Sequence, residues 1–312
     1  MVLPCEEKLE STRGIEVADF VDDRNNMPGG PGDCVIQKYQ DRVLFLMTEK
    51  CFGHCMFCFR QDVLEEKHRK LRGDTLKDKI ERLITHVAEN ASIQEVIISG
   101  GDPLTCSMDH LEFIINEILS RTAIRNIRIH SRALVYQPGV ITEELATILK
   151  KNNIRLVHHI AHPYEICDKV RVAAQLLEST GVAQYNQFTL LRGINDHHEV
   201  LLQLMDKLDS MNIRNLSVFF PDPVLFSSTF RLNFSRIFDI VSRFNWNSPS
   251  WANAIRFCQD SVHGKVRVED LVEYIPEKGY ALFKREDKLI KVPDLPKKLD
   301  IPGEISTLLW KG

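Results

Sequence analysis

Short apolar runs alternate with longer amphipathic segments along most of the chain. The runs are rich in Val, Ile and Leu, and from the second onward they recur about every 30 residues, which is the size of a βαβ unit. Between them, apolar residues recur at three- and four-residue steps, the period of a helix that is buried on one face. Segments 78–89, 108–120 and 170–180 show this period most clearly. The pattern predicts strands at 42–48, 94–99, 125–130, 154–160, 184–190 and 214–220.

Six such units in succession predict an α/β fold in which helices surround a parallel sheet that curls into a partial (β/α)6 barrel of the TIM type. We assign residues 36–222 to this barrel core. Residues 1–35 are polar and rich in turn-forming residues, so we expect an N-terminal arm there. Residues 223–312 leave the repeating pattern, and we expect them to form a C-terminal cap over the mouth of the barrel.

Chemically distinctive residues follow the predicted strands. In parallel α/β sheets, ligands bind at the carboxyl ends of the strands. The residues at those ends are Cys51 to Cys58 after the first strand, Gly100-Gly101-Asp102 after the second, Ser131-Arg132 after the third, His159 to His162 at the fourth, Gln187 in the fifth and Asp222 after the sixth. The sequence therefore predicts one functional site at this edge of the sheet.

Composition excludes several classes of protein. The 312 residues have a net charge of −3 and 44% hydrophobic content, which gives no electrostatic footprint for nucleic acid or for an acidic membrane. No apolar run approaches the roughly 18 residues that span a bilayer, and the first residues lack the pattern of a signal peptide. Eight cysteines are too sparse and uneven for a disulfide framework. We therefore expect a cytoplasmic protein with no membrane or nucleic-acid partner.

The run Cys51-Phe-Gly-His-Cys55-Met-Phe-Cys58 places three thiols within eight residues. Three thiolates at this spacing can hold three irons of a cubane iron–sulfur cluster and leave one iron open for a non-protein ligand. A zinc site is the alternative, but zinc generally takes four protein ligands. His54 lies inside the loop, where binding the same ion as its neighbours would be strained. The run favours a catalytic cluster.

Several segments, in the right order, resemble the radical S-adenosylmethionine (SAM) superfamily and, within it, the lysine 2,3-aminomutase family. The Cys-x3-Cys-x2-Cys loop follows the first strand, as it does in that superfamily. The resemblance runs from about residue 24 to 240 and more loosely to about 290, and it indicates a short, divergent member. The other matching segments are Tyr39 to Leu46, Val96 to Leu104, His159 to Ile166 and Asn186 to Asp196.

The resemblance implies a 4Fe–4S cluster and SAM as cofactors. The open iron would bind the amino and carboxylate groups of SAM, and reductive cleavage would give a radical that abstracts hydrogen. It also implies an electron donor of the flavodoxin or ferredoxin type and a homo-oligomer. The implied cluster ligands are Cys51, Cys55 and Cys58. The implied SAM-binding residues are Gly100, Gly101, Asp102, Arg132, His159 and Gln187.

The family also uses pyridoxal 5′-phosphate (PLP), which carries the migrating amino group. Lys38 and Arg42 match the basic residues that bind the PLP phosphate. Lys265 matches the Schiff-base lysine, although the segment between Asp260 and Lys265 is two residues shorter than in the family and Phe219 replaces a tyrosine. Lys278 is a less favoured substitute for Lys265. Of the substrate-binding residues, Arg60 matches the one for the carboxylate, and Asp222 and Asp260 match those for a distal ammonium.

These residues imply a PLP-dependent 2,3-aminomutase that moves the α-amino group of a basic, lysine-like amino acid to the β-carbon. Two alternatives stay open at this point. One is a radical SAM enzyme on the same scaffold without PLP, such as a dehydrogenase, an epimerase or a peptide-modifying enzyme. The other is a non-catalytic iron–sulfur sensor, although a sensor would not need the nucleotide pocket that residues 100–102 and 132–187 imply.

Overall fold

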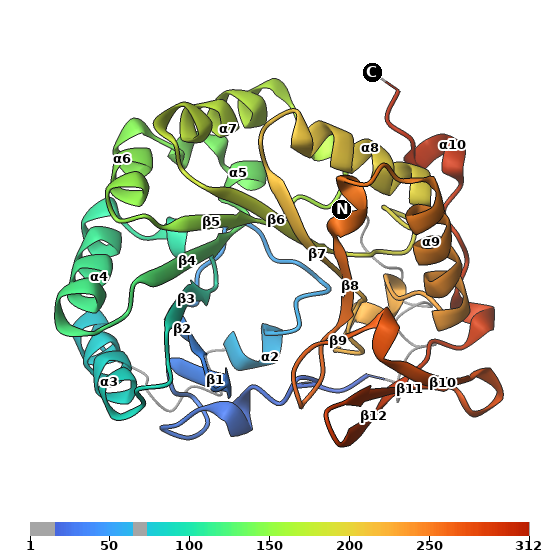
Figure 1. Cartoon of the computed structure of the whole chain (residues 1–312), viewed down its shortest axis with the longest axis horizontal. Helices are drawn as coiled ribbons and strands as arrows, with labels where there is room; N and C mark the ends of the chain where they lie inside the picture. Colours follow the sequence, from blue (N-terminus) through green and yellow to red (C-terminus); the bar gives the residue numbers. More distant parts are fainter. Residues whose placement is uncertain (1–15, 65–73, 312) are drawn as a thin grey trace.

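A curved sheet of nine strands forms the centre of the molecule (Figure 1). The computed structural model describes residues 16–64 and 74–311. The strands lie side by side in chain order, and β2 through β8 are parallel, whereas β1 and β9 pair antiparallel at the two edges. The strands are β1 (Val35–Tyr39), β2 (Arg42–Thr48), β3 (Glu95–Gly100), β4 (Asn126–Ser131), β5 (Arg155–His158), β6 (Gln184–Thr189), β7 (Arg214–Phe219), β8 (Arg256–Gln259) and β9 (Val266–Arg267).

Helices cover the outer face of the sheet, so the predicted α/β partial barrel is confirmed (Figure 1). Their apolar faces form one core with the strands. The long helices are α3 (Leu76–Glu89), α4 (Met108–Arg121), α6 (Glu143–Lys151), α7 (Asp168–Thr180), α8 (His198–Asp209) and α9 (Phe234–Asn247). The short ones are α2 (Gln61–Leu64), α5 (Ala133–Tyr136) and α10 (Ile305–Leu308). None of the helices described is long and apolar enough to cross a membrane.

Alternation along each strand decides which side chains reach the inside of the curve. On β4, Ile127 and Ile129 are buried in the core with the outer helices. The intervening Arg128 and His130 line the inner cavity, because successive side chains of a strand point to opposite faces. At β4 the inner face of the curve is therefore polar, while the outer face packs in the hydrophobic core.

The region after residue 222 differs from the expected cap. The alternation continues through α9 into β8, which pairs with β7 as a seventh parallel strand. This strand is only four residues long and was missed because its short run, Arg-Phe-Cys-Gln, has little apolar signal. A second sheet follows, made of β10 (Leu271–Ile275), β11 (Tyr280–Arg285) and β12 (Lys288–Pro293).

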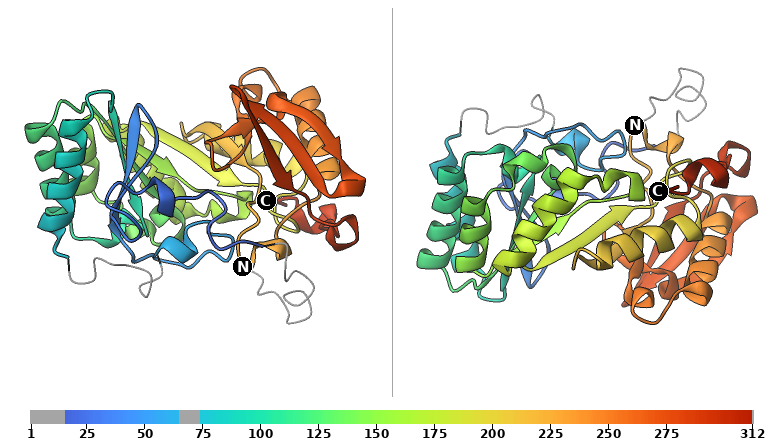
Figure 2. Two further views of the ribbon diagram at one scale, coloured as in Figure 1. Left: turned by 90° about the horizontal axis from the view of Figure 1, so that it is seen from below. Right: turned by 90° about the horizontal axis from the view of Figure 1, so that it is seen from above.

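This three-stranded sheet packs on α9, where the rings of Phe234 and Phe283 lie 5.9 Å apart. It stands at the end of the molecule opposite α3 and α4 (Figure 2). Apart from β9, the strands that follow β8 thus form a separate sheet at the far end of the molecule.

The described part of the N-terminal arm, residues 16–34, runs along the edge of the cavity. Val17 forms a single parallel bridge with Val224, and Asp23 is buried at 2% exposure. A short 3-10 helix, η1 (Arg24–Asn26), follows. Residues 1–15 of the expected arm lie outside the described residues. The arm therefore contributes side chains to the same region as the carboxyl ends of the strands.

Candidate active site

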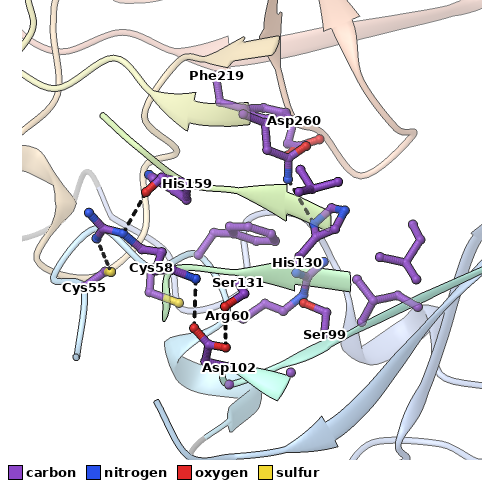
Figure 3. Close-up of a pocket in the computed structure, with 18 of the residues that line it drawn as sticks. Cys55, Cys58, Arg60, Ser99, Asp102, His130, Ser131, His159, Phe219 and Asp260 are labelled. Carbon is purple, nitrogen blue, oxygen red and sulfur yellow. Dashed lines mark hydrogen bonds between the residues drawn. The ribbon is translucent and has the colours of Figure 1, made fainter. Parts of the chain in front are cut away.

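A cavity of about 320 Å³ lies inside the curve of the sheet (Figure 3). It is bounded by the inner face and carboxyl ends of β2 to β8 and by the segments that follow these strands. Every site residue predicted from the sequence lines it, and the role of each stays a prediction. These residues are Lys38, Arg42, Cys51, Cys55, Cys58, Arg60, Gly100, Gly101, Asp102, Arg132, His159, Gln187, Asp222, Asp260 and Lys265.

Two glycines let the end of β3 approach the segment that leads into the cysteine loop. A Cβ on Gly101 would lie 2.1 Å from the carbonyl oxygen of Lys50, and one on Gly100 would lie 2.4 Å from that of Thr48. Gly100 also has a φ of +116°, which favours glycine. The N–H of Gly101 donates to the Thr48 carbonyl at 2.6 Å. The glycines therefore let the end of β3 pack directly against the segment that leads into the cysteine loop.

The three cysteines suit a cluster better than a single ion. In the part of the chain that is described, no three His, Cys, Asp or Glu side chains are arranged around one metal ion. A cubane cluster needs no such convergence, because each thiolate binds its own iron. Burial raises the pKa of Cys51 to about 11, with Cys58 and Cys55 as further causes. Burial also raises the pKa of Cys58. The negative charge of one thiolate disfavours ionisation of the next, and bound iron would offset that charge.

Arg132 joins the cysteine loop to the ends of the next strands. Its Nη1 lies 2.9 Å from Cys55 Sγ, and its Nη2 lies 2.9 Å from Glu165 Oε1. The Arg132 backbone N–H donates to Asp102 at 2.8 Å, and the Ser131 hydroxyl donates to the same carboxyl at 2.8 Å. Figure 3 draws the bonds to Cys55 and to Asp102. Burial raises the pKa of Asp102, although the hydrogen bonds oppose the shift.

Two buried histidines face the cavity. The amide nitrogen of Gln187 lies 3.0 Å from Nδ1 of His130. Nε2 of His130 and Nε2 of His159 are both buried without a hydrogen-bond partner among the described residues. Burial lowers the pKa of each well below its usual value, aided by Arg128 and Lys265 at His130 and by Arg132 at His159. Both imidazoles are therefore neutral near pH 7. In each neutral ring, one nitrogen carries a hydrogen and the other does not.

Arg60 and Lys38 share a carboxylate from the arm. Asp23 Oδ2 lies 2.9 Å from Arg60 Nε, and Oδ1 lies 3.6 Å from Lys38 Nζ. Lys38 also donates to the Val21 carbonyl. Arg42 lies over the ring of Tyr39, with its Cζ 3.7 Å from the ring centre. Arg42 Nη1 also lies 2.9 Å from Asp41 Oδ1. All three basic groups thus have an acidic partner before any ligand binds.

Lys265 enters the cavity from the turn between β8 and β9. Its Nζ lies 4.4 Å from the centre of the Phe219 ring, and its backbone N–H donates to the Tyr39 hydroxyl at 2.9 Å. Gly264 precedes it with a φ of +95° and passes close to Tyr39. Burial lowers the pKa of Lys265, while Asp260 opposes this shift. A neutral amine is therefore more accessible than on a surface lysine.

Asp222 and Asp260 are neighbours at the same end of the cavity. The pKa of Asp222 is raised well above its usual value, first by burial and then by the charge of Asp260. The amide of Gln259 donates to Asp222 Oδ1 at 2.5 Å. A cation placed between the two carboxylates would remove this repulsion.

The cavity also contains residues that sequence reasoning missed. Arg128 and His130 could have been found from alternation along β4, because they occupy its polar positions. Asp23, Tyr39 and Tyr136 gave no comparable signal. Each of them matters through one contact. Asp23 contacts Arg60, 37 positions away, and Tyr39 contacts Lys265, 226 positions away. Tyr136 contacts Arg132, 4 positions away.

The chain is similar to several known proteins. L-lysine 2,3-aminomutase of Methanococcus maripaludis is 31% identical over 246 residues, which cover 78% of this chain and 56% of that protein. Glutamate 2,3-aminomutase of Clostridioides difficile is 28% identical over 90% of this chain and 67% of its own length. SuiB of Streptococcus suis, solved with its precursor peptide SuiA, has a TM-score of 0.49 at 15% identity over 68% of this chain and 47% of that one.

The chain thus spans little more than half of the first of these aminomutases. The model of the radical SAM superfamily matches residues 45–220, which run from β2 to the end of β7 and include the cysteine loop. This match covers over half of the chain, and the chain therefore belongs to the radical SAM superfamily.

Proposed function

We propose that the protein is a PLP-dependent 2,3-aminomutase that moves the α-amino group of a basic, lysine-like amino acid to its β-carbon. Membership of the superfamily implies a 4Fe–4S cluster and SAM. The observation that carries the rest of the proposal is a single cavity lined by both the cysteine loop and Lys265, in which Asp260 lies close to Lys265 and to Asp222. The aminomutases among the relatives support the reaction class.

When bound, SAM on the cluster supplies a radical that removes hydrogen, and PLP supplies the carbonyl group that carries the migrating nitrogen. The chain's own residues hold and orient the reactants. Arg132, with its guanidinium beside Cys55 and Glu165, fixes the end of the cavity where the radical forms. Gly100 and Gly101 line the cavity, where their backbone groups would contact the amino end of SAM, and their lack of a Cβ lets β3 pack against the segment before the cysteine loop.

At the other end, Lys265 is suited to reaction with a carbonyl group. A lysine reacts as the neutral amine, and burial lowers the pKa of Lys265 toward that form. The bond from its backbone N–H to Tyr39 fixes the turn that carries it. Lys38 lies in β1 and Arg42 begins the neighbouring β2. Both line the cavity, where their charges can bind a phosphate.

The acidic pair supports the substrate class. Asp222 and Asp260 lie close together after β7 and β8, and Arg60 follows the cysteine loop; all three line the cavity. A substrate with a carboxylate at one end and an ammonium at the other satisfies both charges. Arg60 would bind the carboxylate through its terminal nitrogens, and the aspartates would bind the distal ammonium. L-Lysine, L-arginine and L-ornithine have this charge pattern.

The test is anaerobic incubation of the reconstituted protein with SAM, PLP, dithionite and one amino acid at a time. We expect a β-amino acid of unchanged mass, which liquid chromatography with mass spectrometry separates from the substrate after derivatisation. We expect 5′-deoxyadenosine only in amounts far below those of the β-amino acid, because the reaction regenerates SAM. L-Glutamate serves as the acidic comparison. A preference for L-glutamate over all three basic amino acids would contradict the assigned substrate class, and the absence of any β-amino acid would contradict the aminomutase.

A second arm tests the lysine. Borohydride reduction of the PLP-loaded protein should attach the cofactor to the peptide that contains Lys265, and Lys265→Ala should abolish this attachment. Lys278→Ala is the matched control, because Lys278 is exposed on the second sheet. Formation of 5′-deoxyadenosine with no trapped cofactor would favour a radical SAM enzyme without PLP.

A further inference from the structure

One buried carboxylate of the N-terminal arm controls the presentation of Arg60. Asp23 Oδ2 accepts a hydrogen bond from Arg60 Nε at 2.9 Å. The Asp23 side chain is 3% exposed and that of Arg60 is 17% exposed, so the pair is shielded from water. Among the described residues, no acceptor bonds to the two terminal nitrogens of Arg60. Asp23 thus holds the Nε edge of the guanidinium, and the Phe59 ring packs against its face, with Arg60 Cζ 4.3 Å from the ring centre. The carboxylate-binding fork is left available.

The position of Asp23 is itself fixed. The backbone N–H groups of Asp23 and Arg24 both donate to the carboxylate of Asp19 at 3.0 Å. This arrangement holds the turn before η1 against the cavity. The second oxygen of Asp23 lies 3.6 Å from Lys38 Nζ, so the same carboxylate also meets a second basic residue that lines the cavity.

Anchoring of the N-terminal arm alone does not explain the contact between Asp23 and Arg60. The arm has another ion pair with the same region, between Arg24 of η1 and Asp62 of α2. Arg24 is 31% exposed and does not line the cavity. The arm is thus docked by Arg24 at its surface, while the adjacent Asp23 points inward to Arg60.

We propose that Asp23 is a positioning residue that orients Arg60 for the carboxylate of the substrate, so that the N-terminal arm completes the substrate site. This inference rests on the proposed function, in which Arg60 binds that carboxylate. A long arginine side chain loses rotamer freedom when it binds. Pairing Nε with Asp23 before the substrate arrives removes part of this cost and directs the terminal nitrogens to the cavity.

The first test measures Arg60 in the purified protein without an amino acid. Phenylglyoxal modifies arginine side chains, and mass spectrometry can follow the Arg60 peptide. We expect Asp23→Asn to speed modification of Arg60 severalfold, because the guanidinium loses its charged partner. The matched control Arg24→Gln should leave the Arg60 rate unchanged. Equal rates in wild type and Asp23→Asn, or equal acceleration in both variants, would overturn the proposal.

The second test uses the holoenzyme and whichever amino acid it turns over. We expect Asp23→Asn to raise KM about tenfold, the scale of one hydrogen bond to a charged group, with kcat changed less than about twofold. Arg24→Gln should keep the wild-type KM. A fall in kcat with KM unchanged in Asp23→Asn would overturn the positioning role.

Asp23→Glu separates position from charge and also serves if the asparagine variant fails to fold. It keeps the ion pair but moves the guanidinium, so we expect slow modification of Arg60 together with a raised KM. Wild-type KM in this variant would overturn the proposal. If wild-type protein turns over no amino acid at all, the proposed function fails, whereas the modification experiment still decides whether Asp23 holds Arg60.

Discussion

Arg132 Nη1 lies 2.9 Å from the Sγ of Cys55, one of the three cysteines expected to bind the cluster. The same nitrogen lies 3.0 Å from the Tyr136 hydroxyl, and the guanidinium lies over the Tyr136 ring. A donor and a positive charge beside a cluster sulfur stabilise the reduced cluster, because reduction adds negative charge. This contact links Arg132 to the electronic properties of the cluster, in addition to its expected role in SAM binding.

We therefore predict that Arg132→Leu makes the reduction potential of the cluster more negative. The measurement is a redox titration followed by electron paramagnetic resonance, made without SAM so that a change in SAM binding cannot contribute. Arg132→Lys keeps the charge and should shift the potential less. Equal iron content in the three proteins is the control, and an unchanged potential in Arg132→Leu would contradict the prediction.

Gly101→Ala should displace the cysteine loop. Its Cβ would lie 2.1 Å from the Lys50 carbonyl oxygen, which is backbone and cannot move without the loop. We expect lower iron content after reconstitution and a loss of stability of about 1–3 kcal/mol, the usual range for a clash that the fold must absorb. Thermal unfolding and iron analysis measure the two effects.

Gly139→Ala is the matched control, because Gly139 has no atom within 4 Å of its expected Cβ and a φ outside the glycine region. It should keep the iron content and stability of the wild type. The same iron content in Gly101→Ala and Gly139→Ala would show that close approach at residue 101 is not required.

Asp222→Asn should stabilise the ligand-free protein at neutral pH. The pKa of Asp222 is raised in the folded state, so the folded protein binds more protons than the unfolded one between the ordinary pKa and the raised one. Stability contributed by this group is then present at low pH and is lost as pH rises through the folded pKa. Each unit of elevation corresponds to about 1.4 kcal/mol.

Thermal unfolding of the wild type and of Asp222→Asn at pH 4 and pH 8 tests the direction of this pH dependence. The gain in melting temperature from Asp222→Asn should be larger at pH 8, where the wild-type carboxyl has ionised or remains protonated at a cost. We also expect weaker binding of basic amino acids by this variant. A gain that is equal at both pH values would contradict the raised pKa.

Asp260→Asn should lower the pKa of Lys265 further. Burial lowers this pKa, and the charge of Asp260 is the largest effect that opposes the shift. Removing that charge leaves the neutral amine present at lower pH. The pH at which half of Lys265 is trapped by PLP and borohydride should therefore fall relative to wild type. Trapping of the exposed Lys278 in the same digest is the internal reference, and a rise in the midpoint for Lys265 would contradict the assignment.

Local patterns were enough to predict the parallel α/β fold and the edge of the sheet where the site lies. Strand and helix periods depend on neighbours a few residues away, and consecutive βα units bring strand ends to one edge. Cys51, Asp102, Arg132 and Gln187 could therefore be placed together from their positions after or within successive strands. The short β8 was missed because four residues with two polar members have no clear period.

Only the tertiary structure decided how these residues are partnered. Asp23 meets Arg60 across 37 positions, and Tyr39 fixes Lys265 across 226. Contacts at such separations depend on the curvature of the whole sheet and on the path of the arm, neither of which leaves a periodic trace in the sequence. Burial has the same origin, since the pKa of Lys265 and of Asp222 shifts chiefly because many distant segments exclude water from them. The sequence by itself determined which chemical groups reach the cavity, whereas packing determined their orientation and charge.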